Sequence, residues 1–350
     1  MAMARMIASA FMMSSVWLEN TPVVVPVQIR QAAFNPWCVS SAVGIMFFME
    51  YRRLGSINVS LVGIGCNNFG WRTDAAGAAA VVDAALDAGI NFFDTADVYG
   101  GGQSEEFLGK ALKGRRTKAI IATKFGIKMG EGKEGARPEY VRQALEDSLR
   151  RLQVDTIDLY QIHFPDPKTP IADTMQTLND AVKAGKVREI GCSNFSPEQM
   201  RAARETTGPK YFASVQNEYS MLKRDPEAQV LPECARTGVA FLPYFPLANG
   251  LLTGKYRKGR PFPESSRGKD AFGPKVFTPE NLERVEALIG FAESHGHSLL
   301  DLAFSWLASH PEVCSVIAGA KTPEQVRANS TGASWKLTPK DMAEVEAKLA

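Results

Sequence analysis

The sequence has little net charge, few cysteines and no long apolar run. Forty Lys and Arg residues against 38 Asp and Glu leave a formal charge of +2, too weak a field to indicate a nucleic acid partner. The five cysteines are scattered without a CxxC pair, which argues against a disulfide framework or a structural zinc site and favours a reducing, cytoplasmic setting. No run reaches the roughly 18 apolar residues that a membrane-spanning helix needs, so we expect no membrane partner.

The first 48 of the 350 residues differ from the rest. They contain six methionines and show neither a helical nor an alternating hydrophobic period. Arg5 before an apolar stretch loosely resembles a signal peptide, but a small-residue cleavage site and a twin arginine are both missing. We therefore interpret residues 1–48 as a non-native or disordered extension, with an export signal as the alternative. A single domain is predicted over 49–350.

From residue 49 onward, short β-rich runs alternate with longer amphipathic ones, which is typical of βαβ units around a parallel sheet. The predicted strands are 60–66, 91–96, 119–125, 156–163, 187–194, 212–219, 239–247 and 314–320. The predicted helices include 74–88, 138–152, 170–184 and 298–309, and SPEQ (196–199) and TPEQ (322–325) read as capping boxes. Eight such units in about 300 residues predict an α/β fold, a (β/α)8 TIM barrel. A hairpin of 51–54 and 59–62 is expected to close the barrel floor.

The rival fold is a doubly wound dinucleotide-binding domain. Its candidate fingerprint, GIGCNN (63–68), lacks the third glycine, and the glycines at 100–102 do not have the GxGxxG spacing either. The longest irregular stretch, 248–277, follows the seventh predicted strand, on the face where barrel active sites are built. A loop of that length in a compact domain is usually functional or disordered.

Polar residues stand at inward positions near the ends of three consecutive strands. Side chains alternate along a strand, so Asp94, Lys124 and His163 point into the barrel at its C-terminal mouth, where Tyr99 follows in a loop. Each has a structural alternative: an ion pair for Asp94 and Lys124, a loop aromatic for Tyr99 and a core position for His163. Together they indicate catalysis. Lys124 is expected to lower the pKa of Tyr99 and make it a general acid, with Asp94 holding Lys124 and His163 orienting a carbonyl oxygen.

Several segments, taken in order, resemble the aldo-keto reductase superfamily from about residue 49 to the C-terminus. They are FDTADVYG (93–100), ATKFG (122–126), LYQIH (159–163), GCSNF (191–195), VQN (215–217) and LPYFPL (242–247). The resemblance implies a (β/α)8 barrel that reduces a carbonyl with hydride from a nicotinamide cofactor, with a catalytic tetrad of Asp94, Tyr99, Lys124 and His163.

The resemblance also implies cofactor-binding residues. Ser193, Asn194 and Gln216 would bind the nicotinamide carboxamide, and Tyr244 would stack on its ring. Amide donors and acceptors and an aromatic neighbour suit such a ring; alternatively, Ser193-Asn194 only begins a helix and Tyr244 is core. The backbone at Gly65 and Cys66 would lie near the ribose. The remaining implied contacts are Leu247, Gly250, Leu251 and Lys255 near the pyrophosphate, and Gly319, Lys321, Gln325 and Asn329 around the adenosine and its 2′-phosphate.

NADP(H) is the expected cofactor. The longer-studied animal reductases carry a lysine where this chain has Gly319, and Lys321 can supply the charge instead. The alternative for Gln325 is that it caps its helix, alone or in addition to binding the cofactor. No metal is expected, since His295 and His297 have no third ligand nearby and read as a helix cap.

Three functions remain open. The leading one is NADPH-dependent reduction of a small aldehyde or ketone. The others are a cofactor-binding regulatory subunit with slow turnover, such as an ion-channel subunit, and an NAD-dependent sugar dehydrogenase. Substrate specificity is expected in the loops around Trp71, 125–137 and 248–277, and the sequence does not indicate an oligomeric state.

Overall fold

The computed structural model describes residues 16–18, 21–23, 49–206, 210–263 and 273–349. The chain divides into two compact units, Met1–Met46 and Phe47–Ala350. In the first unit, β1 (Val16–Leu18) pairs antiparallel with β2 (Thr21–Val23). The rest of the predicted extension, and the part of the 248–277 stretch at 264–272, lie outside the described residues.

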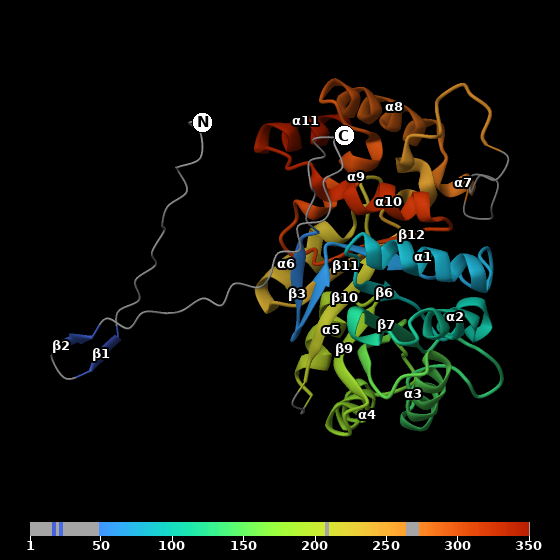
Figure 1. Cartoon of the computed structure of the whole chain (residues 1–350), viewed down its shortest axis with the longest axis vertical. Helices are drawn as coiled ribbons and strands as arrows, with labels where there is room; N and C mark the ends of the chain where they lie inside the picture. The colour runs from blue at the N-terminus through green and yellow to red at the C-terminus, as the bar shows by residue number, and fades with distance from the viewer. Residues whose placement is uncertain (1–15, 19–20, 24–48, 207–209, 264–272, 350) are drawn as a thin grey trace, which may run out of the picture. The chain divides into compact units, whose positions relative to one another are not determined.

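Eight parallel strands form the centre of the second unit (Figure 1). They are β5 (Val62–Gly65), β6 (Phe92–Asp94), β7 (Ile120–Phe125), β8 (Ile157–Ile162), β9 (Val187–Ser193), β10 (Phe212–Glu218), β11 (Ala240–Tyr244) and β12 (Val316–Gly319). From β5 to β11 the strands pair in sequence order, and β12 pairs with β5. Phe241 of β11 exchanges backbone hydrogen bonds with Glu312 and Cys314, just before β12. The sheet therefore nearly closes, and the predicted (β/α)8 barrel is confirmed.

Helices alternate with these strands along the chain. They are α1 (Ala75–Asp87), α2 (Gln103–Ala111), α3 (Pro138–Leu152), α4 (Ile171–Lys183), α5 (Pro197–Arg204), α6 (Pro226–Thr237), α7 (Gly273–Val276), α8 (Pro279–Ser294), α9 (Leu299–Ala308), α10 (Pro323–Thr331) and α11 (Pro339–Leu349), with 3-10 turns η1 (Tyr99–Gly102), η2 (Arg116–Lys118), η3 (Ala248–Thr253) and η5 (Gly332–Ser334). The predicted helices match within one residue at each end. At α5 the predicted capping box is present. At α10 Thr322 caps the helix, but the Gln325 side chain accepts from the Lys321 backbone and not from that of Thr322, so only half of the predicted box forms.

The hairpin is present, but its second strand begins and ends two residues earlier than the predicted range 59–62. It consists of β3 (Tyr51–Leu54) and β4 (Ile57–Ser60), and Val62 already belongs to β5. The difference arises because Gly55, with a φ of 55°, turns the chain within two residues, so that Leu54 pairs directly with Ile57. Similarly, β11 ends at Tyr244 and not at Leu247, because Phe245 takes a positive φ of 50°.

The barrel interior has an apolar lower layer. Buried hairpin residues cluster there with inward-facing strand residues: Leu54, Ile57, Val59, Phe92, Ala122, Leu159, Ala240, Leu242, Cys314 and Ile317. The hairpin thus closes the floor of the barrel. Two residues further along their strands, Phe92, Ala122 and Leu159 are followed by Asp94, Lys124 and Gln161, so the next layer of the same interior is polar.

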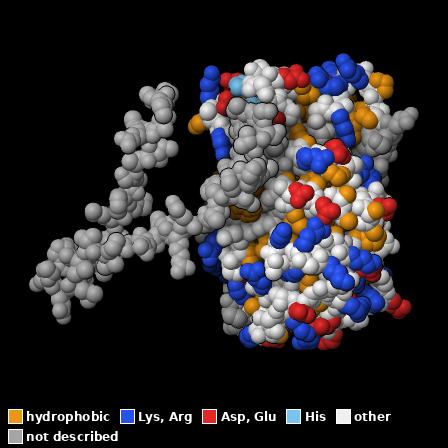
Figure 2. Space-filling model, in the orientation of Figure 1, with side chains coloured by type: hydrophobic (Ala, Val, Ile, Leu, Met, Phe, Trp, Pro, Cys, Tyr) orange, Lys and Arg blue, Asp and Glu red, His pale blue; other side chains and the backbone are white. Residues whose placement is uncertain are grey.

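The surface carries charges of both signs. Lys and Arg side chains are interspersed with Asp and Glu on the face drawn in Figure 2. Among the described residues, no helix combines the length and the apolar character needed to cross a membrane.

Candidate active site

Asp94 and Lys124 form a buried ion pair above the apolar layer. The Lys124 ammonium lies 2.5 Å from Oδ2 of Asp94 and 2.9 Å from the carbonyl oxygen of Thr95, and the Lys124 side chain is fully buried. Burial alone would lower the pKa of Lys124, but the neighbouring Asp94 carboxylate and the Tyr99 phenol together outweigh burial, and the pKa is raised. Lys124 therefore carries its positive charge at neutral pH, as the sequence predicts for a lysine held by Asp94.

Tyr99 opens η1 directly beside this pair. The chain reaches it from β6 through Asp97, whose backbone N–H donates to the Lys124 carbonyl at 3.0 Å, and it leaves through Gly100, whose φ is 58°. The Lys124 Nζ lies 5.1 Å from the centre of the Tyr99 ring. The predicted direction of the phenol's pKa was wrong: burial raises the pKa of Tyr99 more than Lys124 lowers it. Tyr99 thus keeps its proton throughout the neutral range.

His163 completes the group. Its ring lies edge-on to Tyr99, with centroids 5.9 Å apart, and stacks on Phe164 at 5.5 Å. Burial, reinforced by the charge of Lys124, lowers the pKa of His163 to about 3. The imidazole is neutral at physiological pH, so it can donate one hydrogen bond to a substrate oxygen but holds no extra proton to release.

Four more of the predicted residues form a connected polar network at the ends of β9, β10 and β11. Asn194 has a φ of 62° and its amide donates to the carbonyl oxygen of His163 at 3.0 Å. The Tyr244 hydroxyl donates to Oδ1 of Asn194 at 2.9 Å, and the Ser193 hydroxyl donates to the Gln216 carbonyl at 2.7 Å. The Tyr244 ring is therefore held in place before any ligand binds.

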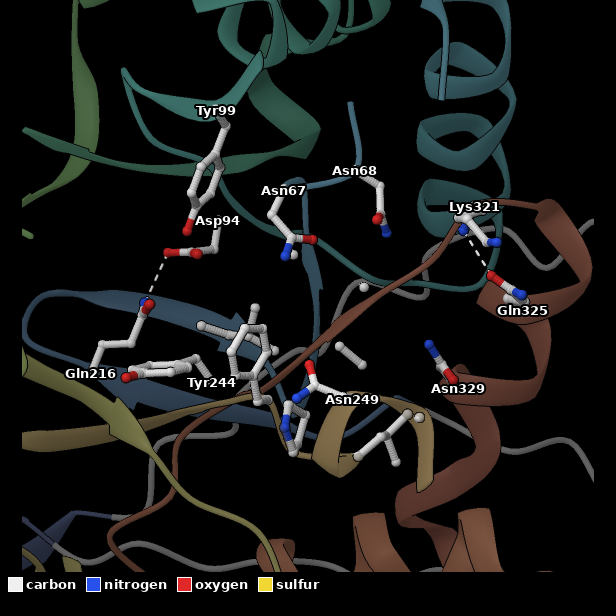
Figure 3. A pocket seen from close by; sticks show the side chains of 18 of the residues that line it. Asn67, Asn68, Asp94, Tyr99, Gln216, Tyr244, Asn249, Lys321, Gln325 and Asn329 are labelled. Carbon is white, nitrogen blue, oxygen red and sulfur yellow. Dashed lines mark hydrogen bonds between the residues drawn. The ribbon is translucent and has the colours of Figure 1, made fainter. Parts of the chain in front are cut away.

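These residues line one end of an elongated pocket of about 660 Å³. Figure 3 shows Asp94, Tyr99, Gln216 and Tyr244 at this end, and Lys321, Gln325 and Asn329 at the other. The predicted residues that line it are Gly65, Asp94, Tyr99, His163, Ser193, Asn194, Gln216, Tyr244, Leu247, Gly250, Lys255, Gly319, Lys321, Gln325 and Asn329. An aromatic ring and amides at one end, glycines between and a lysine at the other end suit a long cofactor with a planar amide-bearing head and an anionic tail.

Three predicted residues are not in the lining. Lys124 lies behind Asp94, and the side chains of Cys66 and Leu251 are fully buried in the hydrophobic core. Burial also raises the pKa of the Cys66 thiol well above its ordinary value. No group of three or more His, Cys, Asp or Glu side chains in the described part of the chain is placed to hold a metal ion, and His295 ends α8 as its cap.

The sequence reasoning missed other lining residues. These are Asn67, Asn68, Ile127, Phe164, Phe245, Pro246, Asn249, Thr253, Leu300, Ile317, Ala318 and Ala328. In Figure 3, Asn67, Asn68 and Asn249 lie between the two ends of the pocket. Paired asparagines directly after the first predicted strand were an available signal for this position. For Leu300 and Ala328 the sequence contains no such signal, since apolar helix residues normally face the core.

A second buried group of ionisable residues lies behind Tyr99. Glu105 on α2 accepts hydrogen bonds from Thr123 at 2.5 Å and Arg151 at 2.6 Å. Asp97 is 1% exposed and accepts from the Tyr140 hydroxyl at 3.4 Å. Burial and the charge of Glu105 raise the pKa of Asp97 to about 7. Two carboxylates thus face one guanidinium, and Asp97 holds its proton in acidic solution.

This cluster makes stability depend on pH. In the unfolded chain the pKa of Asp97 is about 3.9, so the folded protein loses stability as pH rises from about 4 through 7. For a difference of three pKa units, the unmutated protein loses up to about 4 kcal/mol of unfolding free energy. The side chain in Asp97→Asn cannot ionise, so the variant should not lose this stability. We expect urea unfolding to show the variant and the unmutated protein about equally stable at about pH 4 and the variant more stable at about pH 8. An equal difference at both pH values would contradict this.

Known proteins resemble this chain in sequence and in structure. The sequence model of the Aldo/keto reductase family matches residues 61–350. Aldo-keto reductase YhdN of Bacillus subtilis is 36% identical over 313 residues, covering 86% of this chain and 94% of its own. A rice protein named probable voltage-gated potassium channel subunit beta is 33% identical over 319 residues, covering 85% and 96%. The structure of glycerol dehydrogenase AKR11B4 from Gluconobacter oxydans superposes with a TM-score of 0.76 at 35% identity, covering 85% of this chain and 94% of that one.

Proposed function

The chain belongs to the aldo/keto reductase family, and from this premise we propose that it reduces an aldehyde or ketone with NADPH, with Tyr99 as the proton donor. As a family member it is an NAD(P)H-dependent oxidoreductase acting on carbonyl and alcohol groups. The observation that carries the finer proposal is that Asp94, Tyr99 and His163 line one end of a pocket whose other end contains Lys321. Lys124 is not in the lining but forms an ion pair with Asp94.

The residues present fit a nicotinamide cofactor. The Tyr244 ring is anchored through Asn194, and Ser193, Asn194 and Gln216 offer the hydroxyl and amides that a carboxamide needs. When bound, the cofactor supplies the hydride. The chain's own residues hold the carbonyl oxygen near Tyr99 and His163, and Tyr99 gives it a proton.

The apolar residues at the rim of the pocket indicate which class of substrate it prefers. Ile127, Phe164 and Phe245 line the pocket, and the Phe164 side chain is half exposed while stacking on His163. Such a rim favours a carbonyl compound with an apolar or aromatic body over a polyol. We therefore expect benzaldehyde to be reduced faster than glycerol is oxidised.

The test is steady NADPH consumption by the purified chain with a panel of simple aldehydes. Sustained turnover supports the reductase. Binding of NADPH with very slow turnover would instead favour a regulatory subunit, the role that the name of the rice relative suggests. Faster oxidation of a sugar or polyol with NAD would favour the dehydrogenase alternative; the name of the Gluconobacter relative is that of a glycerol dehydrogenase.

NADPH should bind more tightly than NADH. No ion pair engages the Lys321 ammonium in the described part of the chain, and it lies at the far end of the pocket (Figure 3), beside the first turn of α10. A charge-assisted contact to a 2′-phosphate contributes roughly 1.5–3 kcal/mol. Lys321→Ala should therefore weaken NADPH binding by about 10- to 100-fold and leave NADH unchanged. Fluorescence titration measures both. Lys113→Ala, at an exposed lysine outside the pocket, is the control, and equal affinities for both cofactors in the unmutated protein would refute the preference.

We also propose that residues 49–350 are the functional domain and that the proposed activity does not depend on residues 1–48. Every strand and helix of the barrel, and the hairpin that closes its floor, begins after Met49. A chain starting at Met49 should keep its melting temperature and NADPH turnover. A large fall in either would show that the extension stabilises the barrel.

A further inference from the structure

The carboxylate of Asp94 receives hydrogen bonds from three side chains. Lys124 donates to Oδ2 at 2.5 Å, while Gln161 and Gln216 both donate through Nε2 to Oδ1, at 3.2 and 2.9 Å. All four side chains are buried. Together the two amides hold Oδ1 and leave Oδ2 directed at the ammonium.

The two glutamines differ in their exposure to the pocket. Gln216 lines it, at the end where Tyr244 lies (Figure 3), so a cofactor carboxamide bound there competes with Asp94 for the same amide. Gln161 is fully buried and is not part of the lining. Its hydrogen bond to Asp94 is therefore independent of what occupies the pocket.

Gln161 is also poorly suited to a purely structural role. Because a carboxylate can only accept, Nε2 must face Asp94 and Oε1 must face away. That Oε1 is buried and has no hydrogen-bond partner among the described residues, which destabilises the fold. An apolar side chain would avoid this, as Leu159 does two residues earlier on the same inward face of β8. Space for the amide exists because β9 has Gly191 beside it, where a Cβ would lie 3.2 Å from Cγ of Gln161.

We propose that Gln161 is a positioning residue for the proton-donating group. Its amide holds Asp94 Oδ1 when Gln216 turns to the cofactor, so that Oδ2 remains on Lys124 and Lys124 remains beside Tyr99. The inference rests on the proposed function, since it takes Asp94 and Lys124 to support Tyr99.

Two variants of similar shape test it. Gln161→Met has nearly the same length but no donor and no unpaired oxygen. Its melting temperature should be unchanged or higher and its NADPH affinity unchanged, whereas kcat should fall by about 10- to 100-fold, the effect of one hydrogen bond to a charged group. Because Lys124 would be held less firmly, its lowering effect on the Tyr99 pKa should weaken and the alkaline limb of the pH profile should move upward.

Gln161→Glu replaces the amide by a carboxyl group, which can donate a hydrogen bond to Asp94 only while it is protonated. Two carboxyl groups sharing one site keep one proton between them in acid, and the second ionisation is strongly opposed. The variant should be close to the unmutated protein near pH 5 and lose both activity and melting temperature as pH rises to about 8. The change in melting temperature, measured without cofactor, reports the Gln161–Asp94 contact without relying on activity.

Leu159→Ala is the control, because it removes buried volume from the same strand without touching Asp94. It should lower the melting temperature and leave the pH profile in place. If Gln161→Met keeps the unmutated kcat and pH profile, or behaves like Leu159→Ala, Gln161 is not a positioning residue. Failure of the proposed function looks different: the unmutated chain would reduce no aldehyde, while the pH-dependent melting of Gln161→Glu would still test the contact with Asp94.

Discussion

Tyr99→Phe is expected to lower the single-turnover rate of aldehyde reduction by about 10²- to 10⁴-fold, the usual contribution of a general acid. The phenol keeps its proton at neutral pH because burial raises its pKa. His163, with its pKa lowered to about 3, is neutral and has no proton to replace it. The aromatic ring remains in the variant, so the pocket keeps its shape.

NADPH affinity should hold in the same variant. The residues proposed to bind the nicotinamide come from β9, β10 and β11 and are held by one another, through the Tyr244–Asn194 and Ser193–Gln216 hydrogen bonds. The experiment is single-turnover reduction of a reactive aldehyde beside an NADPH titration. Tyr140→Phe is a matched control, since it removes a phenol hydroxyl that hydrogen-bonds Asp97 outside the pocket. The expected loss leaves at most about a hundredth of the rate. If Tyr99→Phe keeps more than about a tenth of the rate, Tyr99 is not the proton donor.

Lys124→Met should lower both stability and rate. It leaves the Asp94 carboxylate buried without its cation, and breaking a buried pair in this way costs about 3–5 kcal/mol. The rate should fall by about 10- to 100-fold, since a charge-assisted contact is worth roughly 1.5–3 kcal/mol. The alkaline limb of the pH profile should move upward, because Lys124 lowers the pKa of Tyr99 and that effect would be lost.

The double variant Asp94→Asn with Lys124→Met separates the two effects. It replaces the ion pair by neutral groups of similar shape, so urea unfolding should show much of the lost stability restored. The rate should stay low, because neither group can act on Tyr99. If the double variant is as unstable as Lys124→Met alone, the uncompensated charge on Asp94 is not the cause of the instability.

The barrel and the centre of its site could be predicted from local sequence signals. Short β-rich runs between longer amphipathic runs predicted the strands, and the inward positions Leu159, Gln161 and His163 show where the interior of one strand becomes polar. The C-terminal ends of parallel strands meet at one mouth, which predicted that Asp94, Lys124 and Tyr99 would come together. The ends of β4 and β11 were misplaced because single backbone conformations, at Gly55 and Phe245, decide where pairing stops.

Which polar groups pair, and how firmly they hold their protons, depends on the three-dimensional arrangement of the chain. The hydrogen bond between Gln216 and Asp94 joins residues 122 positions apart, and no local pattern predicts that contact. The pKa of Tyr99 depends on whether burial outweighs the nearby ammonium, and the sequence reveals the ammonium but not the degree of burial. Composition and periodicity determine which residues turn inward. The pKa of each buried group depends on two opposing effects: the loss of hydration on burial, and the charges and hydrogen bonds of its new neighbours. Both effects depend on distances in three dimensions, and together they set the protonation states in this site.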